Sequence, residues 1–279
     1  MRLITSILFF YIGTAFAFEP HTANYQLSIN GIKIAEEVRT LHDLGDQYFY
    51  TANAKTSGMA ALIKDYTISA SSTFSINKKG VDSNNYQILE QEDKQVTKNY
   101  VIDITSKNNT VMSALTKTQP NVVTWKAKQG NIVDPLSLFL ALSYDLKDKP
   151  DQSEFSYQVA NGKSIEQQHY KKTENQVVRI NSQAFNAVKV EKINSENNNM
   201  QAYFLSGYQY LPVTIKMTKG SKKYLYQIKD FEISEVKKLD KVNGKAREGA
   251  LGHNRRVITS LWANELSRRN LLPQLTKSS

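Results

Sequence analysis

The sequence contains no cysteine, and this absence narrows the class of protein at once. Without cysteine the chain has no disulfide, no thiolate metal site and no lipid-modified N-terminal cysteine. Its fold must therefore be held by a hydrophobic core. Beyond the N-terminal region the only long apolar run is about 14 residues, whereas a membrane-spanning helix needs about 20.

Catalytic and metal-binding motifs are also missing. The chain has four isolated histidines, His21, His42, His169 and His253, without the spacing of a metal site. No Gly-x-Ser-x-Gly elbow, dinucleotide fingerprint or complete phosphate loop occurs. Asp134 stands before Pro135, which favours helix capping over a catalytic role. We therefore expect a non-enzymatic protein with no catalytic residue, no metal and no cofactor.

The first 17 residues have the order of regions found in secretory signal peptides. Arg2 precedes a mostly apolar stretch, and Ala15-Phe16-Ala17 is a small-x-small cleavage signature. We expect cleavage between Ala17 and Phe18, which would release a soluble periplasmic protein that is not a lipoprotein. An uncleaved anchor and an ordinary buried strand are the alternatives.

The net charge of +10 is concentrated near the C-terminus. Residues 237–279 contain ten Lys or Arg against three Asp or Glu, a net charge of +7. Arg2 lies in the expected leader, so the body between them carries only +2. Such a balanced body does not have the electrostatic footprint of a nucleic-acid-binding domain, and no nucleic-acid partner is expected.

Short alternating segments predict β-strands along most of the body. In residues 66–76 (YTISASSTFSI), apolar and hydroxyl side chains alternate, which indicates a strand with one dry face. Asn30-Gly31 separates two such runs and predicts a tight hairpin. Residues 164–170 and 176–180 are expected as two separate strands. Together these patterns predict a mainly β fold, a single curved antiparallel sheet forming a barrel or half-barrel over residues 18–238.

One apolar run, NIVDPLSLFLALSYDL at residues 131–146, departs from this pattern. Asp134 and Pro135 are typical of a helix start, and the residues that follow are apolar on nearly all sides. We expect a buried helix near 134–147, against or partly inside the curved sheet, serving either as core alone or as one wall of a ligand site. The residues expected to contact an apolar ligand are Leu138, Phe139 and Leu142.

Two further helices are expected. Residues 58–64 lie between two strands, where a turn of helix could cap a barrel end. Residues 254–272 have an amphipathic pattern within a basic C-terminal tail, 239–279. We favour packing of this helix on the barrel, with membrane-surface or partner contact as alternatives. The residues expected to make such contacts are Arg255, Arg256, Trp262, Arg268 and Arg269.

Four stretches carry a resemblance to a known family. They are NGIKIAE (30–36), TSGMAAL (56–62), VDPLSL (133–138) and YLPVTI (210–215). Together they resemble the bacterial envelope proteins catalogued as domain of unknown function 3108, over roughly Tyr25 to Val236. The resemblance implies an exported, mostly β-protein and transfers no catalytic residue. A fainter likeness, at the level of the fold, is to periplasmic lipoprotein carriers, in which a curved sheet shelters acyl chains.

Two functions from different classes are compatible with these patterns, and an enzyme, such as a glycan hydrolase that uses carboxylates, comes third because no catalytic constellation supports it. The first is a periplasmic binding or carrier module for an apolar or lipid-like ligand, because concave apolar pockets at barrel mouths are common ligand sites. The second is an envelope scaffold or adaptor that acts through protein or membrane-surface contacts. In that case the apolar helix is simply core and the basic tail makes the contact.

Overall fold

The structure is a computed structural model of the chain, and it describes residues 17–105, 110–116, 120–193 and 199–233. These residues belong to one compact unit that extends to Val236. The expected leader up to residue 16 and the expected helix near 254–272 lie outside the described residues. So do the tail residues Arg255, Arg256, Trp262, Arg268 and Arg269.

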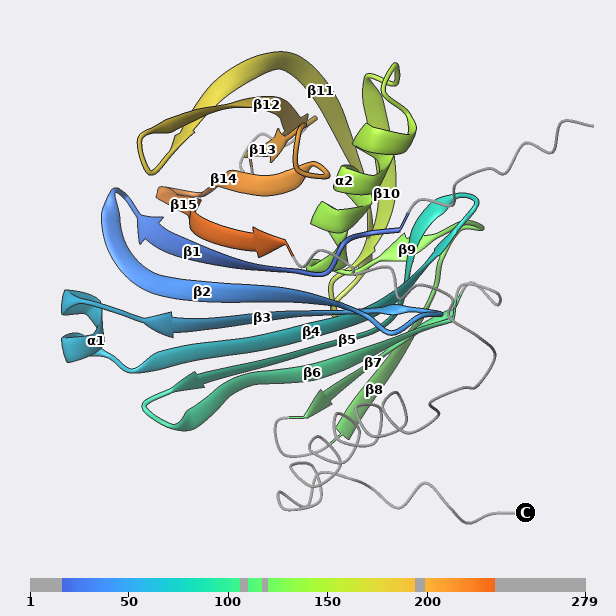
Figure 1. Cartoon of the computed structure of the whole chain (residues 1–279). Helices are drawn as coiled ribbons and strands as arrows, with labels where there is room; N and C mark the ends of the chain where they lie inside the picture. The colour runs from blue at the N-terminus through green and yellow to red at the C-terminus, as the bar shows by residue number, and fades with distance from the viewer. Residues whose placement is uncertain (1–16, 106–109, 117–119, 194–198, 234–279) are drawn as a thin grey trace, which may run out of the picture. The chain divides into compact units, whose positions relative to one another are not determined.

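A single 15-stranded sheet forms the body (Figure 1). The strands are β1 (His21–Ile29), β2 (Ile32–Asp43), β3 (Tyr48–Thr56), β4 (Tyr66–Asn77), β5 (Gly80–Glu92), β6 (Gln95–Thr105), β7 (Thr110–Thr116), β8 (Pro120–Lys126), β9 (Ile132–Val133), β10 (Glu154–Ala160), β11 (Ile165–Ile180), β12 (Gln183–Lys192), β13 (Met200–Leu205), β14 (Leu211–Lys219) and β15 (Lys222–Ile233). Their order in the sheet is β8-β7-β6-β5-β4-β3-β2-β1-β15-β14-β13-β12-β11-β10-β9. The short β9 pairs with β10 in parallel, while the other neighbours are antiparallel. The prediction of a mainly β fold with one curved sheet is confirmed.

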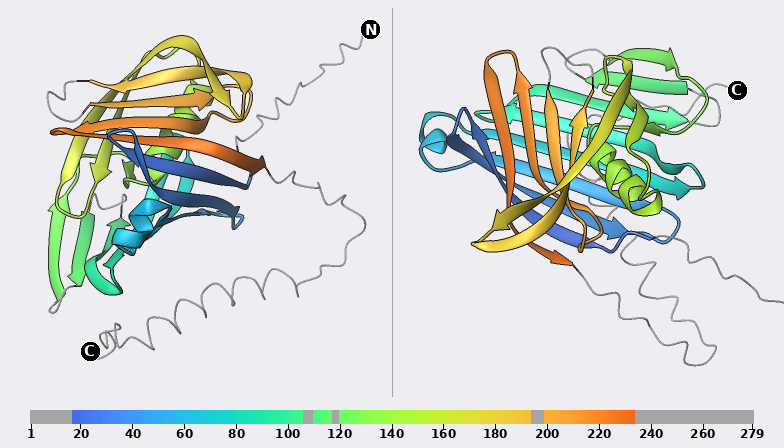
Figure 2. Two further views of the ribbon diagram at one scale, coloured as in Figure 1. Left: turned by 90° about the vertical axis from the view of Figure 1, so that its left-hand side faces the viewer. Right: turned by 90° about the horizontal axis from the view of Figure 1, so that it is seen from above.

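The sheet curls so that β10–β14 lie opposite β3–β6, and Figure 2 shows the same curvature from two further sides. The helix α2 (Ser137–Asp148) occupies the concave space and contacts β5, β10 and β14, strands from both halves. At the closure, the Asp82 side chain on β5 accepts a hydrogen bond of 3.1 Å from the backbone N–H of Ile132 on β9. The sheet is therefore nearly closed into a barrel.

Local sequence signals are confirmed at several points. Asn30 and Gly31 have φ values of 50° and 84°, so both turn positions between β1 and β2 have the positive φ that the hairpin requires. β4 spans Tyr66–Asn77, as the alternation predicted. The prediction of two strands after residue 164 was wrong. β11 runs unbroken from Ile165 to Ile180, because a register shift against β12 absorbs the irregularity in place of a turn.

α2 is buried as its apolar circumference predicted. Of its twelve residues, all except Phe139, Lys147 and Asp148 are buried. The helix begins at Ser137, after a turn at Pro135 and Leu136, rather than at Pro135 itself. The Asp134 carboxylate accepts hydrogen bonds from the backbone N–H groups of Leu136 (2.8 Å) and Ser137 (2.9 Å), so it caps the turn that leads into the helix. The main core lies between this helix and both halves of the sheet. Burying each large apolar side chain there stabilises the fold by about 1.5–3 kcal/mol.

The short helix α1 (Met59–Ile63) connects β3 and β4 as expected, but it covers no core. None of its residues is buried, and it projects from the end of the sheet opposite α2 (Figures 1 and 2). Within the described part of the chain, no helix has the length and apolar character needed to cross a bilayer.

Candidate functional site

A row of side chains crosses five neighbouring strands on the concave face of the sheet. It consists of Tyr170 (β11), Lys192 (β12), Met200 (β13), Met217 (β14) and Tyr224 (β15), and we call it the cross-strand row. The register pairs Tyr170 with Lys192, Met200 with Met217, and Met217 with Tyr224. Residues directly opposite each other in a sheet have Cβ atoms about 4.5–5.5 Å apart. Two methionines and a lysine therefore stand between two tyrosines.

A cavity of about 780 Å³ is lined by the whole cross-strand row. This volume falls within the range of about 300–1,000 Å³ that is typical of small-molecule sites. The opposite walls are Pro135, Leu138 and Phe139 at the start of α2, together with Glu90 and Lys98 of the β5–β6 hairpin. Two of the three residues expected to contact a ligand, Leu138 and Phe139, thus line the cavity. Leu142 lies fully buried in the core, away from its walls.

Aromatic rings stand at one side of this cavity. Phe139 and Tyr226 line it, and the Arg39 guanidinium carbon lies 5.8 Å and 5.7 Å from their ring centroids. Arg39 is buried, and its Nε donates a hydrogen bond to the Glu37 carboxylate. Burial opposes the charge of Arg39, but the neighbouring Glu37 raises the pKa of this guanidinium overall. Burial also raises the pKa of Tyr226 to about 12, so this side of the cavity is aromatic and neutral at physiological pH.

The charged residues that line the cavity are mostly lysines. The Lys98 Nζ pairs with a Glu90 carboxylate oxygen at 2.8 Å, and the Tyr66 hydroxyl donates to the same carboxylate at 2.6 Å. Lys192 and Lys219 also line the cavity, and among the described residues neither forms an ion pair. The charged side chains of the lining therefore sum to two excess positive charges.

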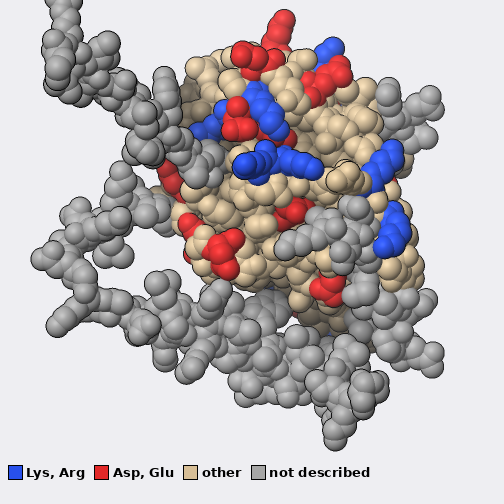
Figure 3. Space-filling model, turned by 90° about the vertical axis from the view of Figure 1, so that its right-hand side faces the viewer, with Lys and Arg blue, Asp and Glu red and all other residues tan. Residues whose placement is uncertain are grey.

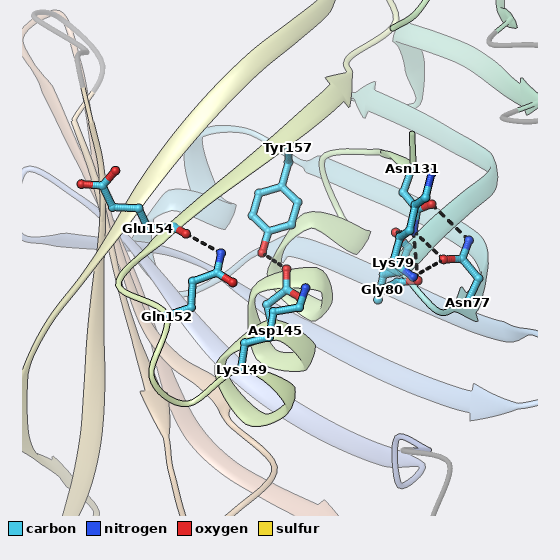
Figure 4. A network of polar contacts seen from close by, with 10 residues as sticks. Asn77, Lys79, Gly80, Asn131, Asp145, Lys149, Gln152, Glu154 and Tyr157 are labelled. Atoms are coloured by element: carbon cyan, nitrogen blue, oxygen red, sulfur yellow. Dashed lines mark hydrogen bonds and ion pairs between the residues drawn. The ribbon is translucent and has the colours of Figure 1, made fainter. Parts of the chain in front are cut away.

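A second cavity of about 320 Å³ lies beside the C-terminal half of α2, and its polar contacts are drawn in Figure 4. The Asp145 carboxylate accepts a hydrogen bond from the Tyr157 hydroxyl and pairs with Lys149 Nζ, both at 2.6 Å. Asn131 donates to the Asn77 side chain at 3.0 Å. These groups already satisfy one another across the closure of the sheet, so we assign this cavity a structural role.

The carboxylate of the buried Asp134 also has its hydrogen-bond partners within the protein. Its second carboxylate oxygen accepts hydrogen bonds from the hydroxyls of Ser72 (2.5 Å) and Ser83 (2.8 Å), which lie on β4 and β5. Burial raises the pKa of Asp134, although these hydrogen bonds oppose the shift. The carboxylate therefore anchors the start of α2 to the sheet and so places Leu138 and Phe139 at the cavity. Among the described residues, no group of three or more His, Asp or Glu is placed to hold a metal ion.

Sequence reasoning missed most of the cavity lining. Lys192, Met200, Met217 and Tyr224 were not predicted as site residues. One signal was present: Lys192 lies on the same side of β12 as the buried Val188 and Val190, where the alternation predicts another apolar residue.

The face of the protein drawn in Figure 3 differs from the cavity lining in its charged side chains. On this face, Lys or Arg and Asp or Glu side chains are interspersed.

The residues of the expected cleavage site lie where the described chain enters the core. Ala17 is exposed, whereas Phe18 is only 3% exposed. The Phe18 ring contacts Tyr48, Phe74 and Tyr144 edge-on, and its backbone N–H donates to the Tyr48 hydroxyl at 3.2 Å. Cleavage between Ala17 and Phe18 stays a prediction.

Comparison with known proteins extends the description of the fold. A β-barrel-like protein of domain of unknown function DUF1849 from Brucella abortus has a similar crystal structure, with a TM-score of 0.53. It is 12% identical, and the similarity covers 78% of this chain and 99% of that one, so it concerns the fold alone. No curated protein matches the sequence. The profile of the family described as "Protein of unknown function (DUF3108)" matches residues 24–226, and the chain belongs to this family.

Proposed function

We propose that the protein is a non-catalytic binding or carrier module for an apolar or lipid-like ligand. The observation that carries this proposal is the cavity of about 780 Å³ between the cross-strand row and the first turn of α2. Met200, Met217, Leu138 and Phe139 give it apolar walls. Methionine side chains are flexible and polarisable, which suits a site that accepts chains of variable shape.

The chemistry of the buried carboxylates supports binding over catalysis. Asp134 is fully buried, and its carboxylate accepts hydrogen bonds from two serine hydroxyls and two backbone N–H groups. Asp145 is paired with Tyr157 and Lys149. A general acid or base must be within hydrogen-bond reach of its substrate, and neither carboxylate lines the large cavity. Glu90 does line it, and its carboxylate is paired with Lys98 and accepts a hydrogen bond from Tyr66.

We also propose that the protein acts in the periplasm after removal of residues 1–17. The order of regions in the leader supports export. A mature chain starting at Phe18 would begin at a residue already buried against Tyr48 and Phe74. N-terminal sequencing of protein from a periplasmic extract tests this, and a mature chain that still carries residues 1–17 would contradict it.

Ligand binding is tested by blocking the cavity. Met217→Trp places a large ring in the cross-strand row, whereas the control Val177→Trp adds the same ring on β11, at a site 65% exposed and outside the cavity. We expect lipid to be extracted from the purified wild-type protein and detected by mass spectrometry, and a neutral fluorescent probe to bind after delipidation. Met217→Trp should abolish probe binding and Val177→Trp should not. Absence of both lipid and probe binding in the wild-type protein would overturn the proposal.

One observation favours a second function, contact with a membrane surface. Met59, Leu62 and Ile63 on α1 are 75%, 80% and 85% exposed, an unusual arrangement for large apolar side chains. A stable protein interface buries about 800 Å² per partner, far more than three side chains offer. We therefore infer a lipid bilayer as the surface into which this short helix inserts, in keeping with an envelope adaptor.

Vesicle flotation tests the second function. The triple variant Met59→Ser/Leu62→Ser/Ile63→Ser should lose flotation with lipid vesicles. Val177→Ser, which removes an apolar side chain that is 65% exposed on β11, should leave flotation intact. A third variant lacking residues 244–279 separates α1 from the basic tail. If only this truncation abolishes flotation, the tail and not α1 makes the contact.

A further inference from the structure

The large cavity has an uneven distribution of charge along its walls. Its neutral side is formed by Phe139 and Tyr226, and two methionines of the cross-strand row continue the apolar surface. Glu191 pairs with Gln201, so the next residues, Lys192 and Met200, come side by side, and both line the cavity. Lys219 lies two residues beyond Met217 on the same face of β14. From this geometry we propose that the ligand is an amphiphile with an anionic head group, a carboxylate or a phosphate, held by Lys192 and Lys219. The inference rests on the proposed binding function and deepens it.

The charges of the lining select the sign of the head group. Glu90, the acid of the cavity wall, is neutralised by Lys98 and by a hydrogen bond from Tyr66. Lys192 and Lys219 have no carboxylate partner within the described chain. Holding two unpaired cations at one cavity is unfavourable, because like charges repel. An anionic head relieves that repulsion, whereas a cationic head adds to it.

The positions of the lysines also select the orientation of the ligand. Lys219 ends β14 and is exposed, and Lys192 ends β12 and is half-buried. Two residues inward along these strands, the same face is occupied by Met217 and by the buried Val190. An acyl chain is therefore expected to run inward between the methionines and the first turn of α2. The head then stays at the strand ends, where lysine ammonium groups donate hydrogen bonds to carboxylate or phosphate oxygens.

Calorimetry with three amphiphiles of one chain length tests the inference. Dodecanoate, dodecyl phosphate and dodecyltrimethylammonium are titrated into delipidated full-length protein below their micelle concentrations. We expect both anions to bind at least about ten-fold more tightly than the cation, because only an anionic head accepts charge-assisted hydrogen bonds from the two lysines. The preference should weaken as salt is raised, because the rim is exposed.

Substitutions identify the groups responsible. Lys192→Gln/Lys219→Gln should weaken anion binding about ten-fold and leave binding of a neutral probe unchanged. The control Lys78→Gln/Lys171→Gln removes the same charge from two exposed sites outside the cavity, and should leave both affinities unchanged. Lipids extracted from the protein then distinguish a free fatty acid from a phospholipid as the natural source of the anionic head.

The possible failures are distinguishable. If no amphiphile or neutral probe binds, the binding function itself is wrong. If all three amphiphiles bind alike and the lysine substitutions change nothing, the function stands and the anionic head is overturned. If inorganic phosphate displaces dodecyl phosphate with equal affinity, the lysines form an ion site in which the chain has no part, and the inference is also overturned.

Discussion

At the scale of single residues, Arg39 and Glu37 form a buried ion pair on β2 behind the cavity. Arg39 stacks on the rings of Tyr25, Phe139 and Tyr226. Removing one partner of a buried pair leaves an uncompensated charge and costs about 3–5 kcal/mol, whereas replacing both partners with apolar residues is often close to neutral. We expect Arg39→Met to lower the free energy of unfolding by about 3–5 kcal/mol in urea denaturation.

The double variant Glu37→Met/Arg39→Met is the matched control for this pair. It removes both charges and should recover most of the stability lost in Arg39→Met. A double variant as unstable as the single one would show that stacking of Arg39 on the rings, and not its charge, provides the stabilisation.

We expect the buried His21 to make the stability of the protein depend on pH. Its side chain is buried, and within the described chain its Nε2 has no hydrogen-bond partner. Burial lowers the pKa of His21 from 6.5, although a hydrogen bond at the Glu19 carbonyl opposes this. The unfolded chain therefore binds the proton more readily than the folded chain does. The stability that comes from burying the neutral imidazole is fully present above pH 6.5 and is lost as the pH falls from 6.5 through the lower pKa of the folded state.

Thermal unfolding between pH 7.5 and 5 tests this dependence. The free energy of unfolding should fall with decreasing pH by at most about 1.4 kcal/mol per pH unit from this one group. His21→Leu should flatten the dependence, whereas His42→Leu, at an exposed site, should retain it. Equal pH dependence in the wild-type protein and His21→Leu would assign the effect to other groups.

At the scale of elements, α2 depends on the Asp134 cluster for its position. Asp134→Ala leaves the hydroxyls of Ser72 and Ser83 and two backbone N–H groups without their partner, which should cost about 3–5 kcal/mol in urea denaturation. Asp134→Asn keeps the shape and one acceptor oxygen. Because burial raises the pKa of Asp134, the charge itself is unfavourable there, so Asn should cost less than about 1.5 kcal/mol. Equal losses in both variants would show that the negative charge is required.

Local sequence patterns predicted some features of these elements and not others. The β1–β2 hairpin and the start of α2 follow from residues adjacent in sequence, Asn30-Gly31 and Asp134-Pro135, and both were predicted. The three polar interruptions of the apolar run could not be interpreted locally. The Ser137 hydroxyl contacts the Ser83 hydroxyl on β5, the Ser143 hydroxyl donates to the carbonyl oxygen of Tyr210 at 2.7 Å, and the Asp145 carboxylate accepts from Tyr157 on β10. Ser143 also donates to the carbonyl oxygen of Phe139 within α2. Because each polar residue has a partner outside the helix, only the fold reveals why it is tolerated there.

At the scale of the body, near-closure of the sheet brings the β10–β11 turn against β6. A Cβ atom at Gly162 would lie 2.6 Å from the ring of the buried Tyr100, and Gly162 has a φ of +82°. Gly162→Ala should therefore combine backbone strain with overpacking and cost about 2–4 kcal/mol.

Gly220 provides the matched control for this closure. It also has a positive φ, +59°, but a Cβ atom added there would meet no other atom within 4 Å. Gly220→Ala should cost only about 1 kcal/mol in the same urea denaturation, through backbone strain alone. An equal loss of stability in the two variants would show that the Tyr100 ring moves aside at little cost, and therefore that the closure is not tightly packed.

The sequence by itself determined the mainly β class, the central buried helix, the hairpin at Asn30-Gly31 and the resemblance to the family. These features depend on residues that are close in the chain, through alternation, capping and turn conformation. Only the tertiary structure decided that Lys192, Met200, Met217 and Tyr224 meet in one row. Strand order and register depend on pairing between distant segments, and a shift of one residue would turn each of these side chains to the other face. The candidate cavity is therefore a property of register, which no local pattern encodes.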